Sequence, residues 1–239
     1  MHTLNSSIQV QDHSQDNARE ALLSRVLSPS PVFTLHGRDD PERDSVEKFV
    51  AMRFFKDYGA DIHEFMPDLL SMRCLKCFSG VIGMRRAATS KLFLEQYLDN
   101  AIEEVLSGTT GADVGRREII EIGNLVAGRK GPSQFVFLIA TSMLHEAGYK
   151  WITFTATQTL ANNLNKLGFH MVKLADASLD RLPQGAAGEW GSYYRTQPCV
   201  YAGSLDGAMA IARRRPLFRK AMAMYRRCIR KLAKEFNGA

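Results

Sequence analysis

The chain has 239 residues, 45% hydrophobic and 23% charged, which fits one large domain or a domain with appendages. Its net charge of +6 favours acidic partners, which can be nucleic acid, anionic lipid or acidic protein. The sequence has neither a run of about 18 apolar residues nor the regions of a secretory signal. We therefore expect a cytoplasmic protein that is at most peripheral to a membrane.

Hydrophobic periodicity predicts strands and helices that alternate along the chain. Strands are expected at 32–36, 68–78, 80–84, 118–126, 150–156, 169–174 and 198–202. Helices are expected at 41–58, 91–106, 134–147 and 159–167, and Gly59 and Gly168 follow two of them as natural C-terminal caps. This order predicts an α/β fold in which helices cover a central sheet.

Both ends of the chain differ in composition from the rest. Residues 1–30 are rich in Ser, Gln, Asn and Asp, and we expect them to form a flexible arm before a domain at 31–208. Residues 209–239 are predicted to form a basic amphipathic helix, because Arg213 to Lys234 includes ten Lys or Arg and no acid. This helix could pack on the core, bind an acidic protein or lie on anionic lipid. Without interleaved aromatic residues it does not favour nucleic acid.

Four cysteines are too few for a disulfide scaffold. Cys74 and Cys77 form a CxxC, a spacing found in zinc and redox sites. No further ligands lie nearby at matching spacing, and the pair falls in a predicted strand or its turn rather than at a helix start. We interpret both as reduced structural cysteines. The histidines likewise show no metal-ligand spacing, so no metal is assigned.

A glycine-containing basic loop separates the strand predicted at 118–126 from the helix that follows it. It consists of Gly128, Arg129, Lys130, Gly131, Pro132 and Ser133. Unpaired N–H groups and the dipole at a helix N-terminus favour anions, and glycine allows a close approach. A pyrophosphate or the phosphate of phosphopantetheine would fit such a loop. The spacing is not that of a P-loop, and an ordinary charged loop is the alternative.

Several segments carry a resemblance to a known family. They are LFLEQYLDNAIEEVLS (92–107), IEIGNLVAG (120–128), GYKWITFTATQTLANNLNKLGF (148–169), LADASLDRL (174–182) and WGSYY (190–194). Through them residues 32–205 resemble the thermostable hemolysin family, a GNAT-like group related to the acyl-homoserine lactone (autoinducer) synthases. The resemblance implies a GNAT-like acyltransferase fold, with a mixed central sheet flanked by helices. It also implies an acyl donor carried on coenzyme A or on phosphopantetheine, whereas the family name records lysis.

The resemblance also suggests candidate catalytic residues. Autoinducer synthases carry a Glu and, three residues later, an Arg on the equivalent strand; here these positions are Glu121 and Asn124. Glu121 is a candidate general base, whereas Asn124 can only hydrogen-bond. Tyr193 or Tyr194 is a candidate to protonate the leaving thiolate. A hydrogen-bonded carboxylate, a backbone cap and aromatic packing are the respective structural alternatives.

Other residues are candidates for contacting the thioester. Arg129, Lys130, Gly131 and Ser133 are expected to contact phosphate, although Pro132-Ser133 departs from the usual GNAT loop. The N–H groups near Val126 would stabilise the oxyanion, and the sheet is expected to splay at 123–125 to admit the pantetheine arm. Asn162 is a candidate for lining the thioester groove, with a solvated side chain as the alternative.

The resemblance, with these residues, implies an N-acyltransferase, and the basic C-terminal helix would suit an acidic acyl carrier protein as a partner. It would transfer a fatty acyl group from acyl-CoA or an acyl carrier protein to the amine of an amino acid or small metabolite. Two alternatives stay open: a membrane-active, hemolysin-like protein and a non-catalytic thioester-binding module.

Overall fold

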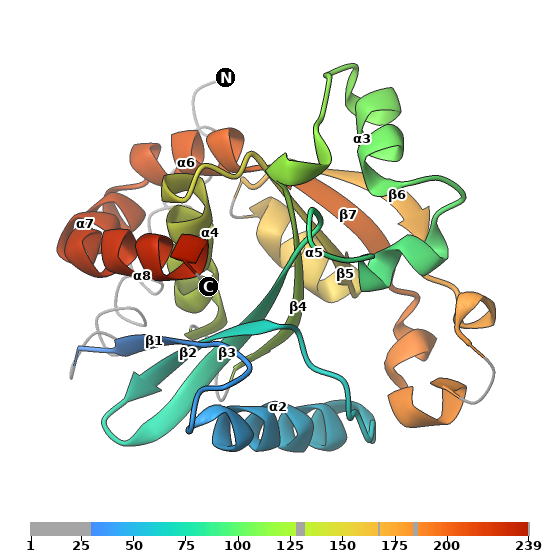
Figure 1. Cartoon of the computed structure of the whole chain (residues 1–239), viewed down its shortest axis with the longest axis horizontal. Coiled ribbons are helices and arrows are strands. Elements are labelled where there is room, and N and C mark those ends of the chain that lie inside the picture. Colours follow the sequence, from blue (N-terminus) through green and yellow to red (C-terminus); the bar gives the residue numbers. More distant parts are fainter. Residues whose placement is uncertain (1–29, 128–131, 167, 184–185, 239) are drawn as a thin grey trace, which may run out of the picture.

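The computed structural model of the chain describes residues 30–127, 132–166, 168–183 and 186–238, and within them lies a seven-stranded mixed sheet (Figure 1). The strand order is β1-β2-β3-β4-β5-β7-β6. Among the described strands, β4 and β5 pair in parallel and the other neighbours pair antiparallel. The strands are β1 (Val32–His36), β2 (Asp68–Cys74), β3 (Cys77–Arg86), β4 (Ile119–Ala127), β5 (Trp151–Ala156), β6 (Met171–Asp176) and β7 (Cys199–Ser204).

Helices cover both faces of this sheet (Figure 1). Because successive side chains of a strand point to opposite faces, Leu69 packs in the cluster beside α2 and Leu70 in the cluster beside α4. Helices α4, α5, α6, α7 and α8 share the second cluster, and α3 closes a third one against β6 and β7. The helices are α2 (Arg43–Tyr58), α3 (Ile102–Thr110), α4 (Pro132–Glu146), α5 (Gln158–Lys166), α6 (Leu205–Arg214), α7 (Pro216–Met224) and α8 (Arg226–Gly238).

Most predicted elements are confirmed close to their predicted bounds. The strand predicted at 32–36 is β1, and the helix predicted to end before Gly59 is α2. Gly59 has φ of 65°, in the left-handed region, and its N–H bonds to the carbonyl of Phe55 at 2.8 Å. The flexible arm was predicted for 1–30, and its residues 1–29 lie outside the described part of the chain.

The prediction of a turn at Ser79-Gly80 is wrong. β2 and β3 form a hairpin whose turn lies at Leu75-Lys76, where Leu75 has φ of 59°. Cys74 and Cys77 therefore pair across the hairpin rather than facing opposite sides of one strand. Because the turn sets how the two strands pair, it determines which residue of β2 lies opposite each residue of β3.

The single helix predicted at 91–106 is also wrong. A short 3-10 helix, η1 (Phe93–Tyr97), precedes α3, and Leu98 and Ala101 between them are extended. The carboxylate of Glu95 explains the break. It accepts hydrogen bonds from the N–H groups of Leu92 and Ile102, so one side chain satisfies unpaired donors at the start of both helices.

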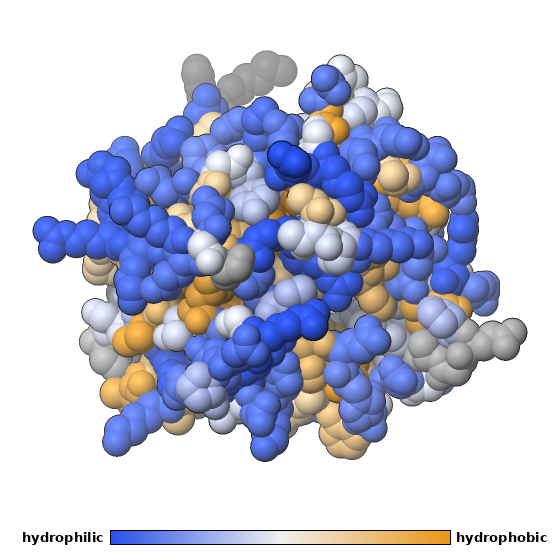
Figure 2. All heavy atoms as spheres, in the orientation of Figure 1, coloured by the Kyte–Doolittle hydropathy of each residue, from blue (hydrophilic) through white to orange (hydrophobic). Residues whose placement is uncertain are grey.

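The C-terminal residues 209–239 do not form one helix. Pro216 lacks an N–H and starts α7 after an extended Arg215, while α6 already begins at Leu205, capped by the Ser204 hydroxyl. The apolar side chains of α7 and α8 are buried in the main core: Phe218, Ile229, Leu232 and Phe236. Hydrophilic residues predominate over the outside of α7 and α8 (Figure 2). This segment thus completes the core of the domain rather than forming an appendage.

β4 and β5 separate part-way along their length, as predicted for 123–125. Their pairing ends at Ile122 and Phe154, after which β4 continues beside β3 while β5 continues beside β7. The register of β3 against β4 shifts between Val81 and Gly83, opposite Asn124, whose φ is 48°. An extra residue in β4 thus makes a β-bulge, which bends the strand away from its parallel neighbour.

Within the described part of the chain, no helix combines the length and the apolar character that a bilayer span requires.

Candidate functional site

A cavity of about 1000 Å³ opens where β4 and β5 separate. Its floor is formed by β4 from Glu121 to Ala127 and by Phe154 to Thr157. Most of the walls come from α2, the loop at 62–66, the segment at 91–97, α5 and the segment at 189–194. Arg85 on β3, Phe137 on α4 and residues 182–183 complete the lining. The cavity is therefore built from elements far apart in sequence, around a gap in the sheet.

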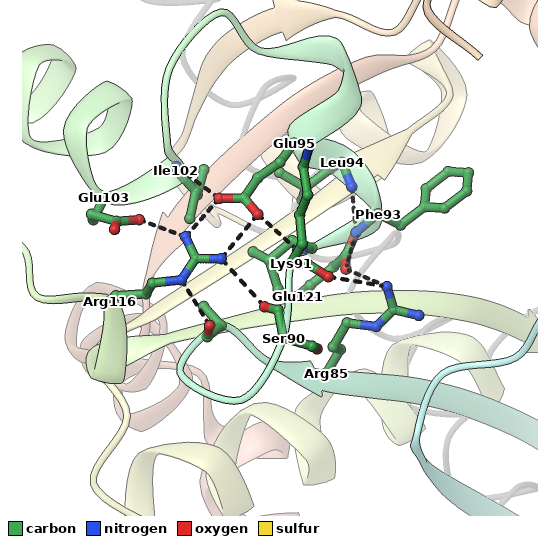
Figure 3. A network of polar contacts seen from close by, with 12 residues as sticks. Arg85, Ser90, Lys91, Phe93, Leu94, Glu95, Ile102, Glu103, Arg116 and Glu121 are labelled. Carbon is green, nitrogen blue, oxygen red and sulfur yellow. Dashed lines mark hydrogen bonds and ion pairs between the residues drawn. The ribbon is translucent and has the colours of Figure 1, made fainter. Parts of the chain in front are cut away.

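Glu121 is a buried carboxylate in this cavity, with 2% of its surface exposed. Its Oε1 accepts the N–H of Leu94 at 2.8 Å and its Oε2 accepts the N–H of Phe93 at 2.9 Å (Figure 3). Burial raises the pKa of Glu121 to about 7, although these hydrogen bonds and the charge of Arg85 act in the opposite direction. At neutral pH this carboxyl group can therefore both take up and release a proton.

A second carboxylate network holds the segment that carries Phe93 and Leu94. Arg116 makes a bidentate contact with Glu95, at 2.6 Å to Oε1 and 2.9 Å to Oε2, and also contacts Glu103 at 2.7 Å (Figure 3). Burial would raise the pKa of Glu95, but the hydrogen bonds from Arg116 and the backbone prevail and hold it at about 2. Glu95 is thus a fixed anion that orients η1 and, through η1, the two donors of Glu121.

Asn124 shapes the cavity from the β-bulge. Its Oδ1 accepts the N–H of Met66 at 2.8 Å, which fixes the loop at 62–66 over the sheet. Two glycines make room for the Met66 side chain. A β-carbon on Gly83 would lie 2.7 Å from Cβ of Met66, and a β-carbon on Gly123 would lie 2.4 Å from Cε of Met66. Asparagine tolerates the left-handed region better than most residues do, which accounts for its place here. A catalytic role for Asn124 stays a prediction.

Aromatic rings form another wall of the cavity, which we name the aromatic wall. It comprises Phe54, Tyr58, Phe93, Tyr97, Trp190, Tyr193 and Tyr194. The Tyr97 and Tyr194 hydroxyl groups hydrogen-bond to each other. Burial raises the pKa of Tyr193 and of Tyr194, so both phenols stay protonated at neutral pH. Both predicted tyrosines therefore line the cavity as neutral hydroxyl groups.

The candidates for binding a donor are only partly described. Val126 is buried and lines the cavity near the end of β4. Arg129, Lys130 and Gly131 lie outside the described residues, as does the side chain of Ser133 at the start of α4. Their expected contacts with phosphate stay predictions.

Asn162 lies outside the cavity, contrary to the expectation that it lines the groove. Its side chain is exposed and accepts a hydrogen bond from Gln158 at 3.2 Å. The helical period explains this, since Leu160 and Leu164 occupy the face of α5 that lines the cavity and Asn162 lies between them in sequence.

Several residues of the site were missed by sequence reasoning. Arg85 lies directly opposite Glu121 in the β3–β4 register, but the strand predicted at 80–84 ended one residue before it. Glu95 is the one charged residue in the largely apolar segment at 92–98, and this signal could have marked it as a buried, partnered carboxylate. Arg116 carries no comparable signal, because its partners come from distant segments.

Residues 36–209 match the family described as "Thermostable hemolysin". The chain belongs to the thermostable hemolysin family. No curated protein sequence matches this family member.

The chain is similar to several solved structures at low sequence identity. FeeM, an N-acyl amino acid synthase from uncultured soil microbes, is 13% identical with a TM-score of 0.51, over 74% of this chain and 93% of FeeM. BjaI, a CoA-dependent acyl-homoserine lactone synthase, is 8% identical with a TM-score of 0.49, over 80% of this chain and 99% of BjaI. LasI, an AHL synthase, is 12% identical with a TM-score of 0.47, over 74% and 90%. The likeness to FeeM confirms the predicted GNAT-like fold, a mixed sheet flanked by helices.

Proposed function

We propose that this protein is an N-acyltransferase. It transfers a fatty acyl group from a thioester, on coenzyme A or an acyl carrier protein, to the amine of an amino acid or small metabolite. The observation that carries the proposal is the cavity at the gap between β4 and β5, with a buried carboxylate of pKa about 7 in its wall. FeeM, which shares the fold, is an N-acyl amino acid synthase, and this makes the same reaction class the first to test.

The geometry supports a direct transfer. The pantetheine arm would occupy the gap between the strands, beside the apolar side chains of Phe137, Phe154 and Leu164. Glu121 takes one proton from the ammonium group of the acceptor, and the free amine then attacks the thioester carbonyl carbon. The N–H near Val126 stabilises the oxyanion that forms. Most of the acceleration comes from holding amine and thioester together.

The products form when the tetrahedral intermediate collapses. The C–S bond breaks and the thiolate takes a proton from Tyr194 or Tyr193. The positively charged nitrogen then gives one of its two protons to the tyrosine and keeps the other as the amide N–H. The hydrogen bond between Tyr97 and Tyr194 provides a second hydroxyl group along this path. The amide and the free thiol leave, and Glu121 returns its proton to water.

A basic surface supports an acyl carrier protein as one form of the donor. Among the described residues of α6, α7 and α8, the exposed cations that form no ion pair are Arg213, Arg214, Arg219, Lys220, Arg226, Arg227 and Lys234. An acidic carrier protein complements this charge, and so does an anionic membrane surface. The anion-binding role of the loop at 128–133 belongs to this proposal as well.

The family name favours a second candidate, a membrane-active protein, and the basic surface could mediate lipid binding. Insertion of α8 would first have to remove Ile229, Leu232 and Phe236 from the core, where they are buried. Liposome leakage measured for the wild type and for the Arg226→Gln/Arg227→Gln double variant separates the candidates. Leakage without any acyl donor that the double variant abolishes would favour the membrane-active protein.

Release of free thiol from long-chain acyl-CoA, followed in the presence and absence of a pool of amines, tests the enzyme directly. We expect amine-dependent thiol release by the wild type and its near loss in Glu121→Gln. Thioester binding without turnover would instead favour a non-catalytic binding module.

A further inference from the structure

Arg85 lines the cavity beside Glu121 and lacks a close carboxylate partner among the described residues. Its Nη1 lies 4.0 Å from Oε2 of Glu121 and 3.5 Å from the carbonyl oxygen of Lys91 (Figure 3). Both separations are longer than an ordinary charge-assisted hydrogen bond of about 2.7–2.9 Å. Arg116, by contrast, contacts Glu95 at 2.6 and 2.9 Å. The guanidinium group of Arg85 therefore has donors to offer a second anion.

The other basic side chains that line the cavity are Arg53, His63 and Lys91, and the first two already lie beside a carboxylate. Arg53 contacts Asp57 at 3.2 Å on α2, and His63 lies 3.4 Å from Asp61. Lys91, which also lines the cavity, is exposed and forms no ion pair within the described residues. Positive charge at the Glu121 end of the cavity thus comes from Arg85, with Lys91 adding to it at the rim.

We propose that Arg85 binds the carboxylate of an α-amino acid acceptor whose amine lies at Glu121. This inference rests on the proposed acyl transfer and names its acceptor class. The amine and the carboxylate of an α-amino acid are attached to the same carbon, and the nearest atoms of Arg85 and Glu121 lie 4.0 Å apart on the cavity lining, so one ligand in the cavity can contact both side chains. The planar guanidinium group matches a carboxylate with two parallel hydrogen bonds.

The aromatic rings near Glu121 also determine which acceptor side chains fit the cavity. Phe93, whose N–H bonds to Glu121, packs its ring 5.6 Å from Trp190 and 6.2 Å from Tyr97. An acceptor held by Arg85 and Glu121 therefore directs its side chain along the aromatic wall. Such a wall favours a large apolar or aromatic side chain.

Matched acceptors test this assignment. Acylation of phenylalanine is compared with that of phenethylamine, and acylation of leucine with that of isopentylamine, because each amine lacks only the carboxylate. We expect kcat/KM of the wild type to favour the amino acid by roughly 10- to 100-fold, as expected of a charge-assisted hydrogen-bonded pair. Arg85→Gln is expected to remove this preference, so that kcat/KM falls roughly 10- to 100-fold more with the amino acid than with its matched amine. Any loss that the two acceptors share reports the effect of the Arg85 charge on Glu121. Arg85→Lys is expected to keep part of the preference.

Arg73→Gln is the matched control. Arg73 lies on β2 outside the cavity lining and contacts Glu42, so its replacement should keep the preference for amino acids. Equal rates of the wild type with amino acid and matched amine would overturn the assignment, whether or not Arg85→Gln folds. So would an equal loss with both acceptors in Arg85→Gln. If the wild type acylates neither acceptor class, the proposed acyl transfer itself fails, and the two failures are thus distinguishable.

Discussion

At the scale of single residues, the chemistry of the site depends on one buried carboxylate. Position 121 was predicted as a base from a family resemblance, but its state comes from tertiary contacts. The two N–H donors of Phe93 and Leu94 and the opposing Arg85 belong to segments about 30 residues away in sequence. No local pattern could have predicted that burial prevails over these groups and raises the pKa of Glu121 to about 7.

The pH dependence of acyl transfer follows from this pKa. A base must be deprotonated, so kcat/KM is expected to rise with pH and to level off above pH about 7. Glu121→Gln should lower kcat/KM by about 100-fold or more and flatten this limb of the profile. Glu118→Gln is the control, because Glu118 pairs with Lys150 and does not line the cavity. A wild-type limb that persists in Glu121→Gln would contradict the assignment.

The raised pKa of Glu121 also predicts how the free energy of unfolding depends on pH. The pKa of Glu121 is 4.5 in the unfolded chain and about 7 in the folded one, so the folded state binds more protons between these values. The free energy of unfolding should therefore lose this contribution as pH rises from 4.5 through 7. Denaturant unfolding of the wild type and Glu121→Gln measures it, and the difference between them should change across this window. A pH-independent difference would contradict the raised pKa.

At the scale of elements, the hydrophobic pattern predicted the strands and most helices because burial dictates their periodicity. The errors lie where a side chain or turn overrides that pattern. Glu95 interrupts a helix that the apolar spacing of 92–106 favours, and Leu75 makes a turn with a left-handed residue that is not glycine. The gap between β4 and β5 was predicted from the resemblance, and its cause, the bulge at Asn124, is visible only in the β3–β4 register.

The aromatic segment at 190–194 docks on the C-terminal end of α2 through one glycine. Gly191 has φ of 52°, and a β-carbon there would lie 2.3 Å from the carbonyl oxygen of Tyr58. Gly191→Ala is therefore expected to cost about 3 kcal/mol in unfolding free energy and to lower acyl transfer by displacing the aromatic wall. Gly188→Ala should change neither, because its β-carbon would meet nothing within 4 Å. Equal behaviour of the two variants in denaturant unfolding would contradict this docking.

At the scale of the whole molecule, the order of strands and helices could be predicted from the sequence, whereas the role of the C-terminal segment could not. The basic stripe on α7 and α8 made the segment look like an appendage, yet its apolar stripe lies against α4. Charge pattern alone does not tell a solvated helix from one that closes a core.

A pair of substitutions tests whether the C-terminal helices belong to the core of the domain. Phe236→Ala is expected to lower the free energy of unfolding by about 3–5 kcal/mol, because Phe236 is fully buried. Lys234→Ala, on the exposed side of the same helix, should change it by about 0.5 kcal/mol or less. Thermal unfolding of the two variants measures these changes, and we expect each variant to unfold in a single transition. An independent appendage would leave the main transition unaffected in both.

The most direct test of acyl transfer is native mass spectrometry of the purified protein mixed with long-chain acyl-CoA, acyl carrier protein and a pool of amines. We expect a bound thioester, together with an acylated amine whose mass identifies the acceptor. No binding of either donor would contradict the acyltransferase proposal and would favour the lipid-surface role of the basic helices.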